Sequence, residues 1–257
     1  MSEKGYIDAR RLRVGGMPMW GPVPGLLLPG VMEAYGIFED FMGIEDLAAA
    51  NSIATSQGVW EYWIQNACGI AQADLAGGAE IMTCGGLDND SGQITLGSLA
   101  GGGAFWLAAN KHLWFEARVT PGVVAAAEFN YYIGLINPVN AAILADNGGA
   151  LPNNDMLGFV VRDTEANWSF VGDRAGAEDM NGLGAGCVVA AAPHYLGFYV
   201  NGLTDVTVYY DRVAIAAGAI VTANMPITGL MPAIAVKAGA IAAETLTVDY
   251  VMCVQLR

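Results

Sequence analysis

Apolar and polar side chains alternate along several stretches of the chain, and this period of two most limits what the sequence can fold into. In Leu246–Arg257 every second residue is apolar, which places six side chains on one predicted face: Leu246, Val248, Tyr250, Met252, Val254 and Leu256. In Leu113–Thr120 the same pattern groups Leu113, Phe115, Ala117 and Val119. A period of two is typical of half-buried β-strands. The sequence therefore predicts mainly strands.

Further strands are expected between turn-forming residues. They lie at Val59–Gln65, Glu80–Cys84, Phe129–Ile136, Met156–Asp163, Asn167–Val171, Tyr195–Asn201 and Asp205–Asp211. Asn201-Gly202 predicts a hairpin, and Asp88–Gly92 and Asn147–Gly149 predict loops. Helical periodicity is weak and allows short helices only at Glu45–Ser56 and Pro138–Leu144. Many strands separated by turns predict an all-β sandwich or jelly roll.

The first 35 residues differ from the rest in their proline and glycine content. Val14–Met32 has no charge over 19 residues but contains four prolines and five glycines, so it is a poor membrane-spanning helix. Met1–Lys4 shows no secretory signal. We predict an extended arm without regular elements over residues 1–35 and one sandwich domain over residues 36–257. The arm's apolar anchors are Trp20, Leu26, Leu27 and Leu28. Composition does not decide whether they pack on their own domain or on a neighbour.

Charged residues are scarce. They make up 14% of the chain, against about 25% in ordinary soluble domains. There are 34 Gly and 41 Ala, which allows two interpretations. Small residues either fill a tightly packed sandwich beneath an uncharged polar surface, or neighbouring subunits cover much of the surface, where charge is costly to desolvate. We favour the second, because a free monomer rarely carries so few charges on its exterior.

The charges that are present are unevenly distributed. The net charge of −14 and a pI near 4.3 argue against binding nucleic acid, because phosphates repel an acidic body. Residues 1–13 carry +2 and the remainder −16, and the arm's basic side chains include Arg10, Arg11 and Arg13. A basic arm on an acidic body suits docking to an acidic neighbour. A solvated tail is the alternative.

Metal sites have little support. Cys68, Cys84, Cys187 and Cys253 lack the spacing of a zinc site, so four reduced and mostly buried thiols are expected. The Asp88-Asn89-Asp90 loop has oxygen ligands suited to calcium, but it lacks the ligand spacing of an EF-hand, and such loops usually form turns. We expect no metal or other cofactor.

Catalytic residues are also few. Sandwich-fold glycanases carry two nearby carboxylates as Glu-x-Asp-x-x-Glu, whereas Glu116 and Asp249 each stand alone on a predicted strand. Four more acids, Glu165, Asp173, Glu178 and Asp179, fall in what is predicted as a solvated loop. His112 and His194 are the only histidines, and Gly101-Gly102-Gly103 lacks the lysine of a phosphate-binding loop and is interpreted as a flexible loop. The sequence predicts no enzyme.

Aromatic residues are candidates for a sugar-stacking platform. The set comprises Trp60, Tyr62, Trp63, Trp106, Trp114, Tyr131, Tyr132 and Trp168. Most are expected to be core or interface anchors, because aromatic residues dominate both. Carbohydrate binding or host adhesion, through loops near Asp88, Asp146 and Asp173, is therefore the alternative function.

Residues 38–257 resemble concanavalin A-like or laminin-G-like jelly rolls found in bacteriophage structural proteins. The matching segments are Phe38–Phe41, Gly77-Gly78 before Met82-Thr83, Asp88–Ile94, Trp114–Val119, Ile133–Leu135, Gly158–Val160, Trp168 and Tyr195–Gly202. The resemblance implies a non-enzymatic head decoration or cement protein on the capsid exterior, made in the host cytoplasm. It implies binding to the major capsid protein or other virion proteins as a homo-oligomer, commonly a trimer, without nucleic acid or membrane. The long arm departs from the lectin relatives and suits a contact across a seam.

Overall fold

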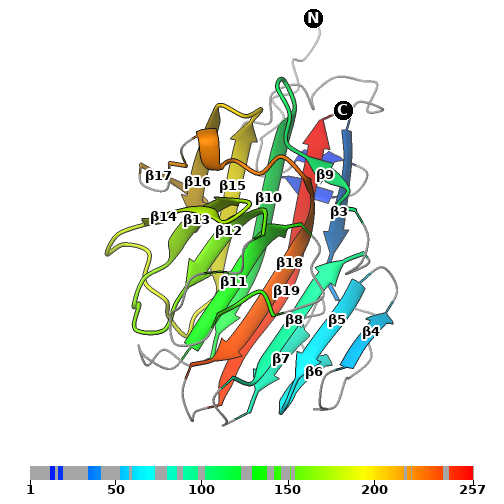
Figure 1. Ribbon diagram of the computed structural model, residues 1–257, viewed down its shortest axis with the longest axis vertical. Helices are drawn as coiled ribbons and strands as arrows, with labels where there is room; N and C mark the ends of the chain where they lie inside the picture. The colour runs from blue at the N-terminus through cyan, green and yellow to red at the C-terminus, as the bar shows by residue number, and fades with distance from the viewer. Residues whose placement is uncertain are drawn as a thin grey trace, which may run out of the picture.

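The computed structural model contains two large β-sheets that pack face to face (Figure 1), besides a separate two-stranded sheet among the described residues. It describes residues 12–14, 17–19, 34–41, 53–57, 60–72, 80–85, 89–97, 102–122, 129–137, 142–145, 151, 154–216, 219–220, 222–239 and 243–256. The strands are β1 Leu12–Val14, β2 Met17–Met19, β3 Ala34–Glu39, β4 Ile53–Gln57, β5 Trp60–Gln65, β6 Cys68–Gln72, β7 Glu80–Cys84, β8 Ser91–Leu96, β9 Phe105–Trp106, β10 His112–Pro121, β11 Phe129–Ile136, β12 Met156–Val161, β13 Ser169–Arg174, β14 Ala177–Gly182, β15 His194–Asn201, β16 Asp205–Tyr210, β17 Val213–Ile215, β18 Gly229–Ala238 and β19 Glu244–Leu256; a short 3-10 helix, η2, spans Thr222–Asn224.

Each sheet is antiparallel throughout its described pairings. One sheet, here called the β10 sheet, has the order β17-β16-β15-β10-β19-β7-β6, with β3 paired to the end of β19. The other, the β11 sheet, has the order β14-β13-β12-β11-β18-β8-β5-β4, with β9 paired to the start of β18. The predicted all-β sandwich is confirmed. All nine predicted strands are present, and Glu80–Cys84 and Phe129–Ile136 have the predicted bounds.

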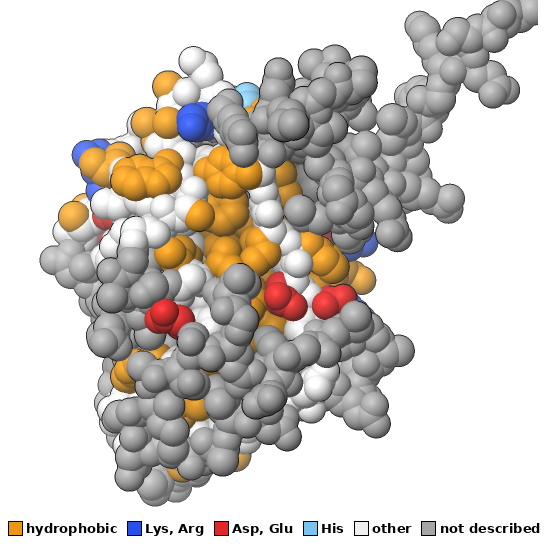
Figure 2. Space-filling model, turned by 90° about the vertical axis from the view of Figure 1, so that its right-hand side faces the viewer, with side chains coloured by type: hydrophobic (Ala, Val, Ile, Leu, Met, Phe, Trp, Pro, Cys, Tyr) orange, Lys and Arg blue, Asp and Glu red, His pale blue; other side chains and the backbone are white. Residues whose placement is uncertain are grey.

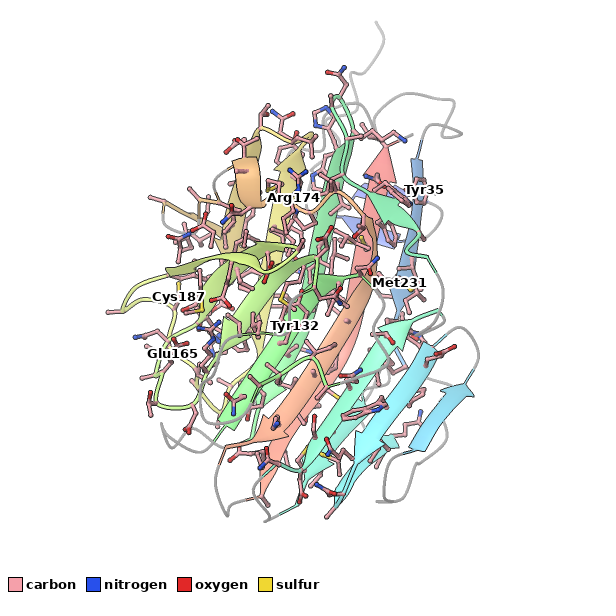
Figure 3. The ribbon with its side chains drawn as sticks, viewed as in Figure 1. Tyr35, Tyr132, Glu165, Arg174, Cys187 and Met231 are labelled. Atoms are coloured by element: carbon pink, nitrogen blue, oxygen red, sulfur yellow. A yellow bond between two sulfur atoms is a disulfide. The ribbon has the colours of Figure 1, made fainter. Side chains whose placement is uncertain are left out.

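The main core lies between the two sheets. Leu113, Phe115, Ala117 and Val119 of β10 all face it, as their alternation predicts. A second apolar cluster covers the outer face of the β11 sheet, where Tyr132 and Val160 pack with Ile143, Leu144 and Leu151 from the segment between β11 and β12. Tyr132 is labelled in Figure 3. Its hydroxyl lies about 3 Å from where a Cβ on Gly134 or Gly158 would sit, so these two strands need glycine there.

The last strand does not keep one face along its length, and the predicted single face is wrong. Arg118 pairs with Tyr250 and Val119 with Val248, so Asp249 is an extra residue in a β-bulge. Leu246 and Val248 face the core before the bulge, and Val251 and Cys253 face it afterwards. A one-residue shift moves every following side chain to the opposite face. Tyr250, Met252 and Val254 consequently lie on the outer face of the β10 sheet.

The alternation missed the central strand β18 of the β11 sheet. Every residue of Gly229–Ala238 is buried, so there is no period of two to detect. Pro232 is another discouraging signal, because proline cannot donate to a strand ladder. It is accommodated because it lies between Leu230, where pairing with β9 ends, and Ala233, where pairing with β8 begins. β18 also pairs with Ser91 and Gly92 of β8, which the sequence had placed in a loop.

Several local predictions need correction. The arm was predicted to lack regular elements, yet β1 and β2 pair as a short hairpin and β3 begins at Ala34. In the sequence, Gly15-Gly16 separates β1 from β2, and a Gly-Gly pair between two strands is a hairpin signal. The predicted helix at Glu45–Ser56 is wrong at its end, because β4 begins at Ile53. In the predicted helix at Pro138–Leu144, residues 142–144 are not helical. The remaining residues of both ranges lie outside the described part of the chain. No described helix has the length and apolar character to cross a membrane.

The cysteines are not all reduced. Cys68 and Cys84 are directly opposite each other in β6 and β7, with Cα atoms 4.0 Å apart, and form a disulfide. The prediction of four thiols is wrong for this pair, because the strand register that brings the cysteines together is not visible in their spacing. Cys187 and Cys253 are free and buried, as expected.

Two glycine predictions also change. The Asn201-Gly202 hairpin is confirmed, but Asn201 pairs with Asp205, so its loop has the three residues 202–204. Gly103 is not part of a flexible loop. A Cβ on it would lie 2.0 Å from the carbonyl carbon of Gly229, so glycine allows this segment to pack against β18. Gly101 lies outside the described residues.

Candidate functional site

Most residues of the predicted arm interface lie outside the described part of the chain. This applies to Arg10, Arg11, Trp20, Leu26, Leu27 and Leu28, and also to Asp88 and Asp146 of the predicted ligand loops. Arg13 lies in β1, of which only the backbone is described. Asn89 has a left-handed backbone with φ of 74°, and Asp90 is buried and accepts a hydrogen bond from the Ala67 amide at 3.4 Å. The Asp90 side chain therefore binds the connection between β5 and β6, 23 residues away in sequence.

The most unusual polar group is Glu116, a carboxylate on the outer face of the β10 sheet that is only 2% exposed. Arg212 donates to both of its oxygens, from Nη2 to Oε1 at 3.0 Å and from Nε to Oε2 at 3.3 Å. The Tyr250 hydroxyl donates to Oε1 as well. Burial raises the pKa of Glu116, and the opposing effects of Arg212 and Tyr250 offset that increase only in part. The group is thus a buried acid held by one guanidinium and one phenol.

Arg212 comes from a strained turn. Asp211 and Arg212 link β16 to β17, and both have positive φ values, 49° and 66°. Such two-residue hairpin turns favour Asn-Gly, because residues with a larger side chain are strained there. The Asp211 carboxylate holds the turn by accepting hydrogen bonds from the Tyr195 amide at 2.9 Å and from His194 at 3.1 Å. This strained turn positions the Arg212 side chain next to Glu116.

The second candidate carboxylate joins the same cluster. Asp249, the bulged residue, forms an ion pair with Arg118, and the Arg118 and Arg212 guanidinium groups lie 5.7 and 3.9 Å from the centre of the Tyr195 ring. No direct contact joins the two carboxylates, and each still stands alone on its strand, but both belong to one network because both arginines contact the Tyr195 ring. The bulge brings them to one patch on neighbouring strands, where each carboxylate is paired with an arginine.

Three of the other acids lie in strands, which corrects the loop prediction for Asp173, Glu178 and Asp179, whereas Glu165 does lie in a loop, between β12 and β13. Asp173 is buried in β13 and accepts a hydrogen bond from the Gly176 amide at 2.7 Å. Glu178 lies in β14 and pairs with Arg162 at 2.6 Å, and Asp179 lies in the same strand. Glu165 accepts from the Arg162 amide at 3.1 Å. Within the described part, no group of three or more His, Cys, Asp or Glu side chains is arranged to hold a metal.

The aromatic set divides as expected. Trp60, Tyr62, Trp114, Tyr131, Tyr132 and Trp168 are buried, and Trp63 is partly buried. Trp106 is the exception, with half of its surface exposed. Its indole nitrogen donates to Gly103 at 3.0 Å and its backbone amide donates to Gln255 at 3.0 Å, so the ring is held in place.

Near Trp106, strands β3 and β9 contact each other through aromatic side chains. Tyr35 of β3, labelled in Figure 3, stacks on Phe105 at 5.4 Å and donates to the Ala104 carbonyl at 2.9 Å. Tyr35, Ile37 and Leu96 pack against the core but are only partly buried. Figure 2, which views this flank, shows apolar side chains gathered in a strip with acidic side chains beside its lower end.

The two histidines serve as hydrogen-bonding partners on the β10 sheet. His112 contacts the Tyr199 hydroxyl at 2.5 Å and stacks on its ring, and Trp114 lies 5.0 Å from the same ring. His194 contacts Asp211 and the Tyr210 hydroxyl, the latter at 2.8 Å. His112 therefore belongs to an aromatic cluster on the outer face, and His194 belongs to the hydrogen bonds around the Asp211 turn.

The exposed surface of the described residues is nearly uncharged. The exposed residues are mostly Ala and Gly, and the charged residues among them are Asp205, Asp211 and Arg212. The other charged side chains whose burial is described are partly or fully buried. At the end of the sandwich where β14 and β17 are the edge strands (Figure 1), the exposed residues include Val188, Ala191, Ala192, Val213, Ala214, Ala216, Ala219 and Ala223. We call this region the β14–β17 flank.

Comparison with known proteins places the fold in one class. No protein-family model and no curated protein matches the sequence. Solved structures do match: peanut lectin has a TM-score of 0.56 at 12% identity, covering 87% of this chain and 97% of the lectin. An endo-1,3-β-glucanase from Streptomyces sioyaensis gives 0.53 at 14%, covering 92% and 99%. The carbohydrate recognition domain of Emp47p gives 0.51 at 12%, covering 81% and 93%.

These likenesses show that the chain has a concanavalin A-like jelly-roll fold. At such low identity they establish the fold alone, because this fold carries both sugar-binding proteins and enzymes. They confirm the jelly-roll part of the family resemblance.

Proposed function

We propose that the chain is a non-enzymatic structural subunit that covers the exterior of a bacteriophage head and is itself assembled as a homo-oligomer, with a trimer favoured. The observation that carries the proposal is the nearly uncharged exposed surface of the described residues. Charged groups are depleted at the centre of protein interfaces because they must be desolvated. A surface of Ala, Gly and Val can be covered by neighbouring subunits without that cost.

The β14–β17 flank is the best candidate contact within this surface. It is exposed, apolar in composition, and bounded by two edge strands whose outer backbone groups have no further strand beside them in the described sheets. Exposed edges are sites where another chain can add. The capsid role itself is supported by the resemblance of residues 38–257 to phage structural jelly rolls and by the basic arm on an acidic body.

The native mass of the purified chain tests the assembly. We expect a species of several 26.8 kDa chains, and attachment of the protein to heads built from the major capsid protein of the same phage. Removal of residues 1–35 should weaken attachment while the sandwich stays folded. A single-chain mass at high concentration, together with no binding to such heads, would overturn the proposal.

Carbohydrate binding is the second candidate function, and Trp106 favours it. Its half-exposed and firmly held indole offers an apolar surface against which a sugar ring can pack, on a fold shared with a lectin and a carbohydrate recognition domain. A glycan array probed with the wild type and with Trp106→Ala tests it. Hits lost in the variant support sugar binding at this position, and an array without hits refutes it.

A further inference from the structure

The outer face of the β10 sheet contains an apolar patch that is sealed from solvent within a single chain. Trp114, Met252 and Val254 are 3%, 1% and 1% exposed. Trp114 pairs directly with Val254, and Glu116 pairs with Met252 on the adjoining position. The outer face of an antiparallel sheet normally meets water. Burial this complete therefore requires a layer on top of the sheet.

The two apolar clusters of the sandwich do not supply this layer. The cluster between the sheets and the cluster on the outer face of the β11 sheet contain neither Trp114 nor Met252 nor Val254. The described neighbours come from the same sheet and stand at the edge of the patch: Tyr199 packs against Trp114, and Tyr250 packs against Phe38 at 5.5 Å. They border the patch without being a separate layer.

We infer that the N-terminal segment, residues 1–33, docks on this patch and is the missing layer in the isolated chain. The point of entry fits. The segment leads directly into β3, whose first residue, Ala34, pairs with Leu256, two positions from Val254 on β19. Figure 1 draws the β1–β2 hairpin behind β10 and β19, on the side of the β10 sheet that faces away from the β11 sheet.

The chemistry of the segment also fits this patch. The hairpin strands carry Leu12, Val14, Met17 and Met19, and Trp20 follows. Residues 1–13 carry +2, whereas the rest of the chain carries −16, so the segment is attracted to the body it covers. Asp205 and Asp211, on the strand and turn beside β15, are exposed acids on this sheet.

This inference concerns the isolated subunit and stands apart from the proposed capsid role. In the docked state the segment packs its large apolar side chains against the sheet and is not a solvated tail. A subunit that released it would expose Trp114, Met252 and Val254 together, and an exposed patch of that kind is adhesive.

Methionine oxidation offers a direct test, because Met252 lies in the patch and Met225, 2% exposed, lies in the core between the sheets. Hydrogen peroxide oxidises methionine according to its access to solvent. We compare the full chain with truncations lacking residues 1–10 or 1–20, and follow each methionine by peptide mass spectrometry. Loss of the hairpin should raise the oxidation rate of Met252 by roughly tenfold or more, since it removes the local protection. Met225 should remain protected in every variant.

A second experiment applies if the truncated chain does not fold. A protease site placed between Gly30 and Val31 allows the segment to be cut after folding and removed by gel filtration. Met252 should then become reactive, and adding a peptide of residues 1–30 should restore its protection. If Met252 stays as protected as Met225 after the segment is removed, the inference is overturned.

Discussion

Replacing Arg212 by alanine should destabilise the protein in a pH-dependent way. The change removes one of the two partners of the buried Glu116 carboxylate and leaves Tyr250. Breaking a fully buried pair costs about 3–5 kcal/mol, and an exposed pair contributes about 0–1 kcal/mol. Glu116 is buried but the Arg212 side chain is 46% exposed, so we expect an intermediate loss of about 2 kcal/mol at pH 7. That corresponds to a fall in Tm of roughly 4–8 °C.

The dependence on pH follows from the direction of the pKa shift. Burial raises the pKa of Glu116 above its ordinary value of 4.5, so the folded state binds this proton more tightly than the unfolded state does. Its charged form therefore disfavours folding above the raised pKa, and this penalty is absent below 4.5. Removal of Arg212 raises the pKa further. The difference in unfolding free energy between wild type and variant should be largest near pH 7 and shrink as the pH falls toward 4.

Urea unfolding of wild type and variant at both pH values measures this difference. Arg118→Ala is the matched control, because its pair with Asp249 is partly exposed and should cost at most about 1 kcal/mol. In a Glu116→Gln background, Arg212→Ala should have a smaller effect. A loss for Arg212→Ala no greater than that for Arg118→Ala, or the same loss at pH 7 and pH 4, would show that Arg212 does not stabilise the Glu116 carboxylate.

Three further predictions concern other parts of the chain. Burial alone would raise the pKa of Asp155, but hydrogen bonds from Thr228 and three backbone amides prevail and hold this pKa below 3.8. Asp155→Asn should therefore lower the unfolding free energy by about 1–3 kcal/mol at pH 7, and this loss should narrow as the pH falls below 3.8. Denaturant titrations measure the loss, and the same loss at every pH would contradict the prediction. Reducing the Cys68–Cys84 disulfide, whose partners are 16 residues apart, should lower the unfolding free energy by about 3 kcal/mol, measured with and without a thiol reductant; an unchanged Tm would argue against it. Val213→Lys on the β14–β17 flank should reduce the native mass, whereas Ala71→Lys, on β6 at the opposite edge of the same sheet, should not; equal masses for both variants would exclude that flank as the contact.

Local patterns in the sequence determined the fold class and nine of the nineteen described strands. Alternation in Leu113–Thr120 identified β10 and its core-facing side chains, and Asn201-Gly202 identified a hairpin. These signals are local, because a strand's two faces and a turn's backbone depend on neighbouring residues. The scarcity of charge was also visible in composition alone, and the exposed surface of the described residues agrees with it.

Only the tertiary structure decided which distant residues meet. The bulge at Asp249 reverses the face of β19, and no pattern in that strand announces it because its apolar residues alternate on both sides of the bulge. Register between β6 and β7 makes Cys68 and Cys84 partners, and the turn at Asp211 carries Arg212 to Glu116, 96 residues away in sequence. Pairings of this kind depend on how strands align across a sheet, which the sequence of one strand does not contain.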